Sequence, residues 1–321
     1  MKRLSFLKLI DDDLRRVEAL LREQPHGQHE VINVAIDHLI SGGGKRIRPA
    51  MVLLSAHLCQ ADTERALYAA AAVEMLHTAT LVHDDLIDGA LMRRGVETLN
   101  ANWPPAATVL TGDYVFARAA YLAAQANNIH LMQRFAETLT IICNGEIRQM
   151  FNGRKTRVSQ VEYEQRIYAK TASLIAMSSE AGAILAHAGD ETRAALRTYG
   201  EQVGLAFQIV DDVLDFAADE QTLGKPVGSD LRQGLITLPL LVCLEQNPDH
   251  PLLNGVLQPD PPADVVEAAI RLVADPACID AAMDVAQAYA ARAKVALGIL
   301  PDDPYRQALL DLADFVVRRR F

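Results

Sequence analysis

The pattern Asp-Asp-x-x-Asp occurs twice in the sequence, each time inside an apolar stretch. The six aspartates are Asp84, Asp85, Asp88, Asp211, Asp212 and Asp215. The first and last aspartate of each copy are four positions apart, so on an α-helix their side chains share a face, with β-carbons roughly 6 Å apart. An acidic surface face could explain one copy, but Leu, Ile, Val, Ala and Phe surround both. Since charges on apolar helices are rarely buried unless they are paired or bound to metal, the sequence predicts two paired carboxylate sites.

Carboxylates this close repel each other, and a dication between them relieves the repulsion. Mg²⁺ prefers oxygen ligands and is usually held by one or two carboxylates together with phosphate oxygens. Each copy of the pattern therefore predicts a magnesium site that handles a phosphorylated substrate.

The rest of the chain is typical of helices. Aromatic residues make up only 5%, whereas Ala and Leu, which favour helix over strand, are abundant. Helices are expected at about 5–23, 28–41, from 49 onward, 63–88, 106–125, 129–151, 159–187, 190–216, 234–246, 263–275, 278–298 and 304–320. The proline-rich segment 247–262 is expected to be a surface connection, and no run of alternating strand residues is evident. We therefore expect an all-α fold in which residues 1–321 form a single domain.

Composition also limits the partners and the location. The formal net charge of -10 argues against nucleic acid as a partner, because nucleic-acid binding depends on clustered cations. The cysteines are far apart in the sequence, as expected for thiols in a reducing cytoplasm, and are Cys59, Cys143, Cys243 and Cys278. No apolar run approaches the roughly 18 residues of a transmembrane helix, and Asp11 follows the N-terminus too soon for a secretory signal.

Several cations are placed where they could meet phosphate. They are Lys45, Arg46, Arg48, Arg93, Arg94, Lys170 and Lys225. The segment Gly42-Gly43-Gly44-Lys45-Arg46-Ile47-Arg48-Pro49 sets three of them at a helix entry, which is a good anion site although it is not a Walker loop. Any one of these residues could be an ordinary surface cation, but together they supply the positive charge that a diphosphate requires.

These motifs resemble those of the trans-isoprenyl diphosphate synthases, with the bacterial long-chain synthases of the octaprenyl type most similar. The resemblance covers nearly the whole chain and is carried by Gly43–Pro49, His77–Asp85, Met92–Gly95, Gly112-Asp113, Lys170-Thr171, Phe207-Gln208, Asp211-Asp212 and Thr237-Leu238-Pro239. It implies the isoprenoid synthase fold, a single large helical bundle around a deep central cavity. It also implies a homodimer. Because a long product would be lipophilic, we expect loose membrane contact when the product leaves, although no segment of the chain demands it.

The resemblance further implies roles for individual residues. The six aspartates would bind about three Mg²⁺ per active site, one triplet on each wall of the cavity. Residues that match contacts to the allylic diphosphate are Arg93, Lys170, Thr171, Gln208 and Lys225. Residues that match contacts to isopentenyl diphosphate are Lys45, Arg48, His77 and Arg94. Arg46 lies in the motif without an assigned ligand, and His83 is expected to be a helix histidine whose hydrogen bonds are satisfied.

The implied reaction is head-to-tail condensation of isopentenyl diphosphate with an allylic prenyl diphosphate. Product length should depend on the residues below the first aspartates. Ala79, five residues before Asp84, and Thr80 are both small, so they leave room for a growing chain. Each five-carbon unit that enters an apolar tunnel gains about 3–4 kcal/mol, so an open floor favours continued elongation. The resemblance implies an all-trans product of roughly C30 to C50.

Three alternatives and two departures from the family pattern remain. A geranylgeranyl or farnesyl diphosphate synthase would share the same motifs. A non-catalytic subunit of a heteromeric synthase would be expected to lose an aspartate motif, and both are intact. A head-to-head synthase or terpene cyclase would leave the Gly43–Pro49 segment unexplained.

The sequence departs from the family pattern at two places. Leu235 stands where the family commonly has a basic residue, and Arg232 could supply the missing positive charge. Gly89-Ala90 stands where the family has more polar residues.

Overall fold

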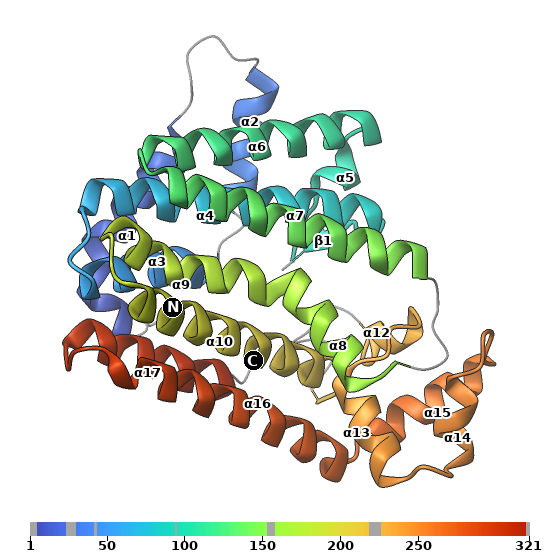
Figure 1. The fold of residues 1–321 in the computed structure, drawn as a ribbon. Helices are drawn as coiled ribbons and strands as arrows, with labels where there is room; N and C mark the ends of the chain where they lie inside the picture. Colours follow the sequence, from blue (N-terminus) through green and yellow to red (C-terminus); the bar gives the residue numbers. More distant parts are fainter. Residues whose placement is uncertain are drawn as a thin grey trace. The chain divides into compact units, whose positions relative to one another are not determined.

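The computed structural model describes residues 5–23, 30–41, 44–93, 95–152, 158–217 and 226–318, and these are helical almost throughout (Figure 1). The α-helices are α1 (Asp11–Arg22), α2 (Glu30–Ser41), α3 (Ile47–Leu58), α4 (Thr63–Ile87), α5 (Leu99–Asn102), α6 (Pro105–Gln125), α7 (Ile129–Asn152), α8 (Gln160–Ile167), α9 (Ser173–Leu185), α10 (Asp190–Ala217), α12 (Ser229–Arg232), α13 (Leu238–Gln246), α14 (Pro251–Val256), α15 (Ala263–Val273), α16 (Pro276–Ala296) and α17 (Pro304–Arg318). The prediction of an all-α fold is confirmed.

The remaining elements are short. Ser5–Ile10 and Leu297–Ile299 form 3-10 helices, and Tyr168–Ala172 form a π-helical turn between α8 and α9. Strands β1 (Met92–Arg93) and β2 (Val96–Glu97) pair antiparallel. The chain divides into two compact units, described separately below. Unit 1 comprises 1–138, 174–197 and 299–309, and unit 2 comprises 139–173, 198–298 and 310–321. That the whole chain forms one domain stays a prediction.

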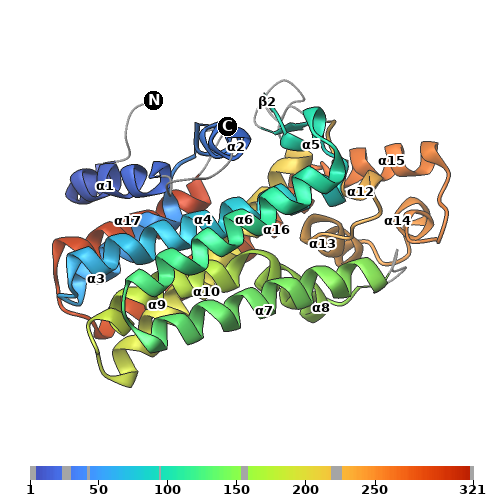
Figure 2. The ribbon, with the colours of Figure 1, turned by 90° about the horizontal axis from the view of Figure 1, so that it is seen from above.

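Unit 1 is built on α4, which begins where the sequence predicts. The carboxylate of Asp62 caps the helix by accepting a hydrogen bond from the amide of Arg65 at 2.9 Å. The alanines Ala69–Ala72 are all buried, and their methyl side chains allow neighbouring helices to come close. Helix α4 packs against α3 and α6, and α6 runs along its length (Figure 2). This packing holds the last turn of α4, which carries the first aspartates, in a fixed position.

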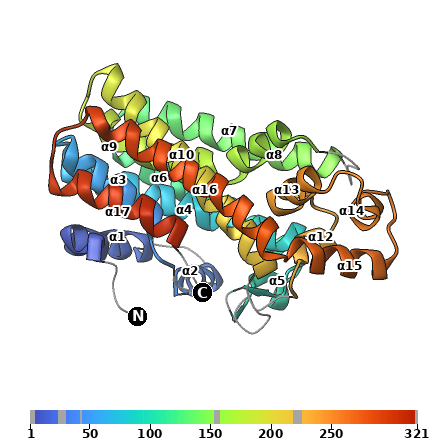
Figure 3. The same cartoon turned by 90° about the horizontal axis from the view of Figure 1, so that it is seen from below.

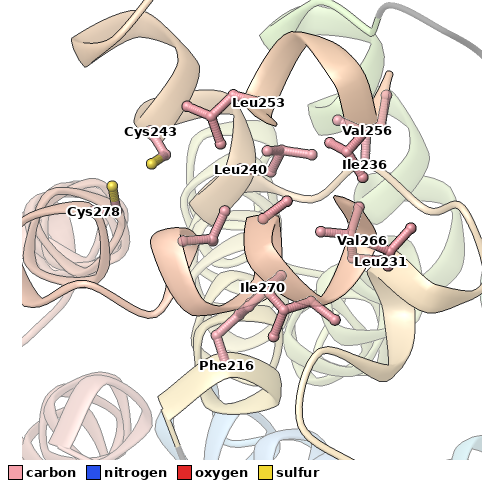
Figure 4. Packing of buried hydrophobic residues seen from close by; sticks show 12 residues of the cluster. Phe216, Leu231, Ile236, Leu240, Cys243, Leu253, Val256, Val266, Ile270 and Cys278 are labelled. Carbon is pink, nitrogen blue, oxygen red and sulfur yellow. The ribbon is translucent and has the colours of Figure 1, made fainter. Parts of the chain in front are cut away.

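Unit 2 has a hydrophobic core of its own beside the second aspartate cluster. Helices α13, α14 and α15 lie together and α12 contacts α15 (Figure 3). Leu240, Leu253 and Ile270 are among the buried residues between them, and Phe216, which follows Asp215 on α10, joins the same cluster (Figure 4). The core therefore anchors the end of α10 that carries the second aspartates.

Several predicted boundaries are wrong, each for a local reason. The helix expected over 159–187 is interrupted by the π-helical turn, and the helix expected over 234–246 begins only at Leu238. The segment expected to be a connection contains α14, because Pro251 occupies the first helical position, where its missing N–H costs nothing. The two strands are only two residues long, too short to give an alternating pattern.

Candidate active site

The first aspartate cluster lies at the C-terminal end of α4. Asp84 and Asp85 are in its last turn, and Asp88 is the residue at which the helix ends, its amide donating to the carbonyl of Asp84 at 2.8 Å. Asp85 is buried, Asp84 is half-buried and Asp88 is exposed. The two aspartates that are four positions apart thus share a face that reaches solvent, whereas Asp85 points elsewhere.

Arg93 is the partner of the buried Asp85. Its Nε donates to Oδ1 of Asp85 at 2.8 Å, and burial raises the pKa of Asp85 while Arg93 acts against that rise. Arg93 lies on β1, and the hydroxyl of Thr98, just after β2, donates to the carbonyl of Ala90 at 2.7 Å. The β1–β2 hairpin therefore folds back onto the end of α4 and brings Arg93 to Asp85.

The other predicted residues of unit 1 lie at the start of α3 and along α4. Lys45 is exposed, and Arg48 and His77 are half-buried. Arg46 instead points inward, where Nη1 donates to Oε1 of the buried Glu74 at 2.6 Å. It has a left-handed backbone (φ 49°), and its second guanidinium nitrogen donates to the carbonyl of Ile40 at 3.0 Å. Arg46 thus ties α3 to α2 and α4. Arg94 lies outside the described residues.

His83 contacts α6. Its Nε2 lies 3.3 Å from the carbonyl oxygen of Val109, and its ring packs against Phe116. A Cβ added to Gly112 would lie only 2.2 Å from this Nε2, so the glycine makes room for the imidazole. The glycine of the Gly112-Asp113 motif is thereby explained by packing, and Oδ1 of Asp113 lies 3.6 Å from the same Nε2.

The second aspartate cluster lies in the last two turns of α10. Asp211 is half-buried, while Asp212 and Asp215 are buried. Oδ2 of Asp215 accepts from the amide of Asp230 at 3.1 Å, and its carbonyl accepts from the amide of Gly228 at 2.7 Å. Gly228 has φ 69°, which a glycine adopts without strain. These bonds fix the segment that leads into α12 against the cluster.

Asp212 is held by a hydrogen-bond network. Its Oδ2 accepts from the hydroxyl of Tyr163 at 2.7 Å, and its Oδ1 accepts from Nε2 of Gln208 at 2.9 Å. Oε1 of Gln208 in turn accepts from the hydroxyl of Thr171 at 2.7 Å. Burial raises the pKa of Asp212 to about 7, and the two hydrogen bonds oppose that rise. The structure therefore brings Thr171, Gln208 and Asp212 together as neighbours, and adds Tyr163, which the sequence analysis missed.

The remaining candidates of unit 2 lie near this network or beyond the described residues. Lys170 is exposed in the π-helical turn, with its Nζ 3.8 Å from Oε1 of Glu146. Leu235 is half-buried and lines a cavity of about 750 Å³ together with residues of α7 and α8. Arg232, a candidate to replace the missing cation, donates to Glu267 at 3.0 Å. Lys225 lies outside the described residues.

Ala79 and Thr80 differ in their setting. Ala79 is completely buried. Thr80 is half-buried, lies four residues before Asp84 on the same face of α4, and donates its hydroxyl to the carbonyl of His77 at 2.8 Å. Thr80 is therefore the small residue directly below Asp84, one helical turn away.

The donor chemistry of both clusters suits a hard cation. All six candidate ligands are carboxylates, and oxygen is the donor that Mg²⁺ prefers. Among the residues that the structure describes, no group of three or more His, Cys, Asp or Glu side chains is arranged to hold a metal ion on its own. Mg²⁺ in proteins is usually bound by one or two carboxylates together with phosphate oxygens or water.

Comparison with known proteins agrees with this arrangement. The sequence model of the polyprenyl synthetase family matches residues 29–273. Octaprenyl diphosphate synthase of Haemophilus influenzae is 35% identical, covering 98% of this chain and 96% of its own length. Heptaprenyl diphosphate synthase component 2 of Geobacillus stearothermophilus is 38% identical, covering 100% of both chains. The crystal structure of polyprenyl synthase from Caulobacter crescentus, complexed with calcium and isoprenyl diphosphate, superposes with a TM-score of 0.90 at 38% identity, covering 98% of this chain and 97% of that one.

A helical fold with two aspartate clusters, matched over its whole length by such relatives, defines a trans-prenyltransferase. The chain belongs to the polyprenyl synthetase family, and its activity is that of a trans-prenyl diphosphate synthase. Both predictions from the sequence are confirmed. Within the described part of the chain, no helix is both long and apolar enough to cross a membrane.

Proposed function

We propose that the protein joins isopentenyl diphosphate repeatedly to an allylic prenyl diphosphate and makes an all-trans product of roughly C30 to C50. The observation that carries the length is the small residue below the first aspartates. Thr80 lies one turn before Asp84 on the same face, and its neighbour Ala79 has only a methyl group. The relatives named octaprenyl and heptaprenyl diphosphate synthases support the same length class.

We assign the magnesium sites, about three ions in all, to the six aspartates. Asp84 and Asp88 share a solvent-reaching face, which suits direct ligands. Asp85 accepts from Arg93, and Asp212 accepts from two protein donors, so these carboxylates are already oriented. Bound Mg²⁺ would neutralise the charge that develops on the departing diphosphate.

The chain's own residues bind the substrates and stabilise charge. We assign the allylic diphosphate to Arg93, Lys170 and Lys225. We assign isopentenyl diphosphate to Lys45, Arg48, His77 and Arg94. The oxygen dipoles of Thr171 and Gln208 would stabilise the allylic cation, which the double bond of isopentenyl diphosphate attacks. No protein nucleophile is required, because the released diphosphate can accept the proton.

The test is product analysis with the purified chain. Labelled isopentenyl diphosphate and Mg²⁺ are incubated with dimethylallyl, geranyl, farnesyl or geranylgeranyl diphosphate, and the products are separated by chain length. Products of six or more isoprene units from every accepted starter support the assignment. Products that stop at farnesyl or geranylgeranyl diphosphate show a short-chain synthase instead.

A second candidate is the catalytic subunit of a heteromeric synthase, which the full-length similarity to heptaprenyl diphosphate synthase component 2 favours. Activity of the purified chain alone contradicts it. If the chain is inactive alone and becomes active when a cell extract of its source is added, the heteromeric assignment holds.

We further propose that two copies of the chain pair through α6 and α7. One row of exposed residues along α7 alternates four and three positions, the spacing of coiled-coil helices, and comprises Ile129, Gln133, Ala136, Thr140, Cys143, Ile147 and Met150. Leu110 and Tyr121 are exposed on α6. Light scattering should give twice the chain mass of 35.1 kDa, and Ile147→Asp should return the mass to that of one chain. A single-chain mass for the unmodified protein refutes the pairing.

A further inference from the structure

Tyr163 is a buried polar residue to which the proposed reaction gives no role. Its side chain is 1% exposed, and its hydroxyl donates to Oδ2 of Asp212 at 2.7 Å. The guanidinium of Arg166 lies 5.5 Å from the centre of its ring, and Arg166 also donates to the carbonyl of Ile236. Enclosed in this way, the phenol has little freedom to turn away from the carboxylate.

The proposed function makes Asp212 a magnesium ligand, and a carboxylate that binds Mg²⁺ is ionised. An ionised carboxylate only accepts, so Gln208 presents its amide nitrogen to it, as the structure shows. The carbonyl end of the same amide then faces Thr171, and since a carbonyl oxygen only accepts, the hydroxyl of Thr171 must donate. The oxygen of Thr171 keeps its lone pairs for another neighbour. The orientation of the Asp212 carboxylate thus determines that the hydroxyl of Thr171, two hydrogen bonds away, donates rather than accepts.

We infer that Tyr163 is a positioning residue that locks the carboxylate of Asp212 and, through Gln208, directs the lone pairs of Thr171. This rests on the proposed function, in which Asp212 belongs to a magnesium site and Thr171 faces the allylic cation. Without the phenol, one oxygen of Asp212 loses its donor. The carboxylate can then rotate, and both the metal site and the orientation of Thr171 become less defined.

The first experiment measures binding without turnover. Calorimetry with Mg²⁺ and inorganic pyrophosphate compares the unmodified protein with Tyr163→Phe and with the control Tyr289→Phe. Tyr289 is a neighbour of Tyr163 and also hydrogen-bonds a carboxylate, but that of Glu164 on α8 rather than that of Asp212. We expect the Kd to rise about tenfold for Tyr163→Phe and to stay within twofold for Tyr289→Phe. Equal Kd values for all three proteins overturn the inference, and so does an equal rise in both variants.

The second experiment is a double-mutant cycle on kcat with Tyr163→Phe and Thr171→Val, singly and together. If Tyr163 acts through Thr171, the double variant should be no slower than the slower single variant. The assays use saturating Mg²⁺, so that weaker metal binding does not affect kcat. Losses that multiply under these conditions show independent effects and overturn the inference. Each variant is measured at a temperature where circular dichroism shows it folded, so a change in stability does not enter. If the unmodified protein binds no Mg²⁺–pyrophosphate and forms no product, the proposed function itself is wrong. If the unmodified protein does both and Tyr163→Phe behaves like it, only the inference about Tyr163 is wrong.

Discussion

Replacing Gly204 by alanine should separate Thr171 from Gln208. Gly204 lies on α10 one turn before Gln208, and a Cβ there would be 2.5 Å from Cα and 2.7 Å from Cβ of Ala172, the residue after Thr171. Ordinary contacts begin at 3.4 Å, so the two backbones must move apart by about 0.9 Å. The same movement would lengthen the 2.7 Å bond between Thr171 and Gln208 to about 3.6 Å, beyond the range of a hydrogen bond.

Two opposing effects set the stability of Gly204→Ala. Overpacking typically costs about 1–3 kcal/mol, while alanine in a helix interior returns about 1 kcal/mol relative to glycine. We therefore expect a net loss of about 0–2 kcal/mol and a fall in Tm of no more than a few degrees. Because a displacement of about 1 Å at a reacting group can cost about 100-fold, kcat should fall much more than stability does.

The assay measures Tm by calorimetry and kcat by incorporation of labelled isopentenyl diphosphate. Gly298→Ala is the matched control, since a Cβ at Gly298 meets nothing within 4 Å. A Gly204→Ala protein with the Tm and kcat of Gly298→Ala would refute the reasoning, because the backbones would then not be in contact at this point.

Three further predictions follow from single residues. Ala79→Phe should shorten the products, as seen by chromatography, since a phenyl ring would enter the space below the first aspartates; unchanged lengths exclude Ala79 from that region. Arg46→Met should lower the free energy of unfolding by about 3 kcal/mol in urea titrations, because it leaves Glu74 buried without its cation; a loss below about 1 kcal/mol would show that water reaches the carboxylate. Arg93→Met should lower kcat by about 100-fold and leave secondary structure unchanged by circular dichroism, because it removes a cation from Asp85; normal kcat would limit Arg93 to packing.

The sequence predicted the elements whose signals are local. Helix α4 was expected to begin at an Asp62 cap, and it does. The last three helices were also expected close to their observed positions. The π-helical turn was missed because Tyr168–Ala172 contain ordinary helix-forming residues. It lies where Ala169 and Ala172 approach Gly145 and Gly204 closely, and such contacts are invisible in one sequence.

In the candidate site, too, contacts between residues far apart in the sequence could not be predicted. The aspartates, cations and polar residues were found because motifs place them next to one another along the chain. The partners that orient them were not found. Tyr163 is 49 positions from Asp212, and Arg46 reaches Glu74 across 28 positions, so only the fold reveals that they meet. The role of Arg46 as an internal tie was open from the sequence, because its neighbours Lys45 and Arg48 carry the same charge.

The wide turn between α8 and α9 takes up one residue more than a regular α-helical turn. Deleting one residue from Tyr168–Ala172 would therefore restore regular α-helical winding and leave α8 and α9 close to their present relative orientation. The same deletion inside α9 would instead rotate the residues beyond it by about 100°. An alignment that matches this segment to a regular helix without a gap would misassign the facing side of every residue in the downstream helix, although each amino acid would still look matched.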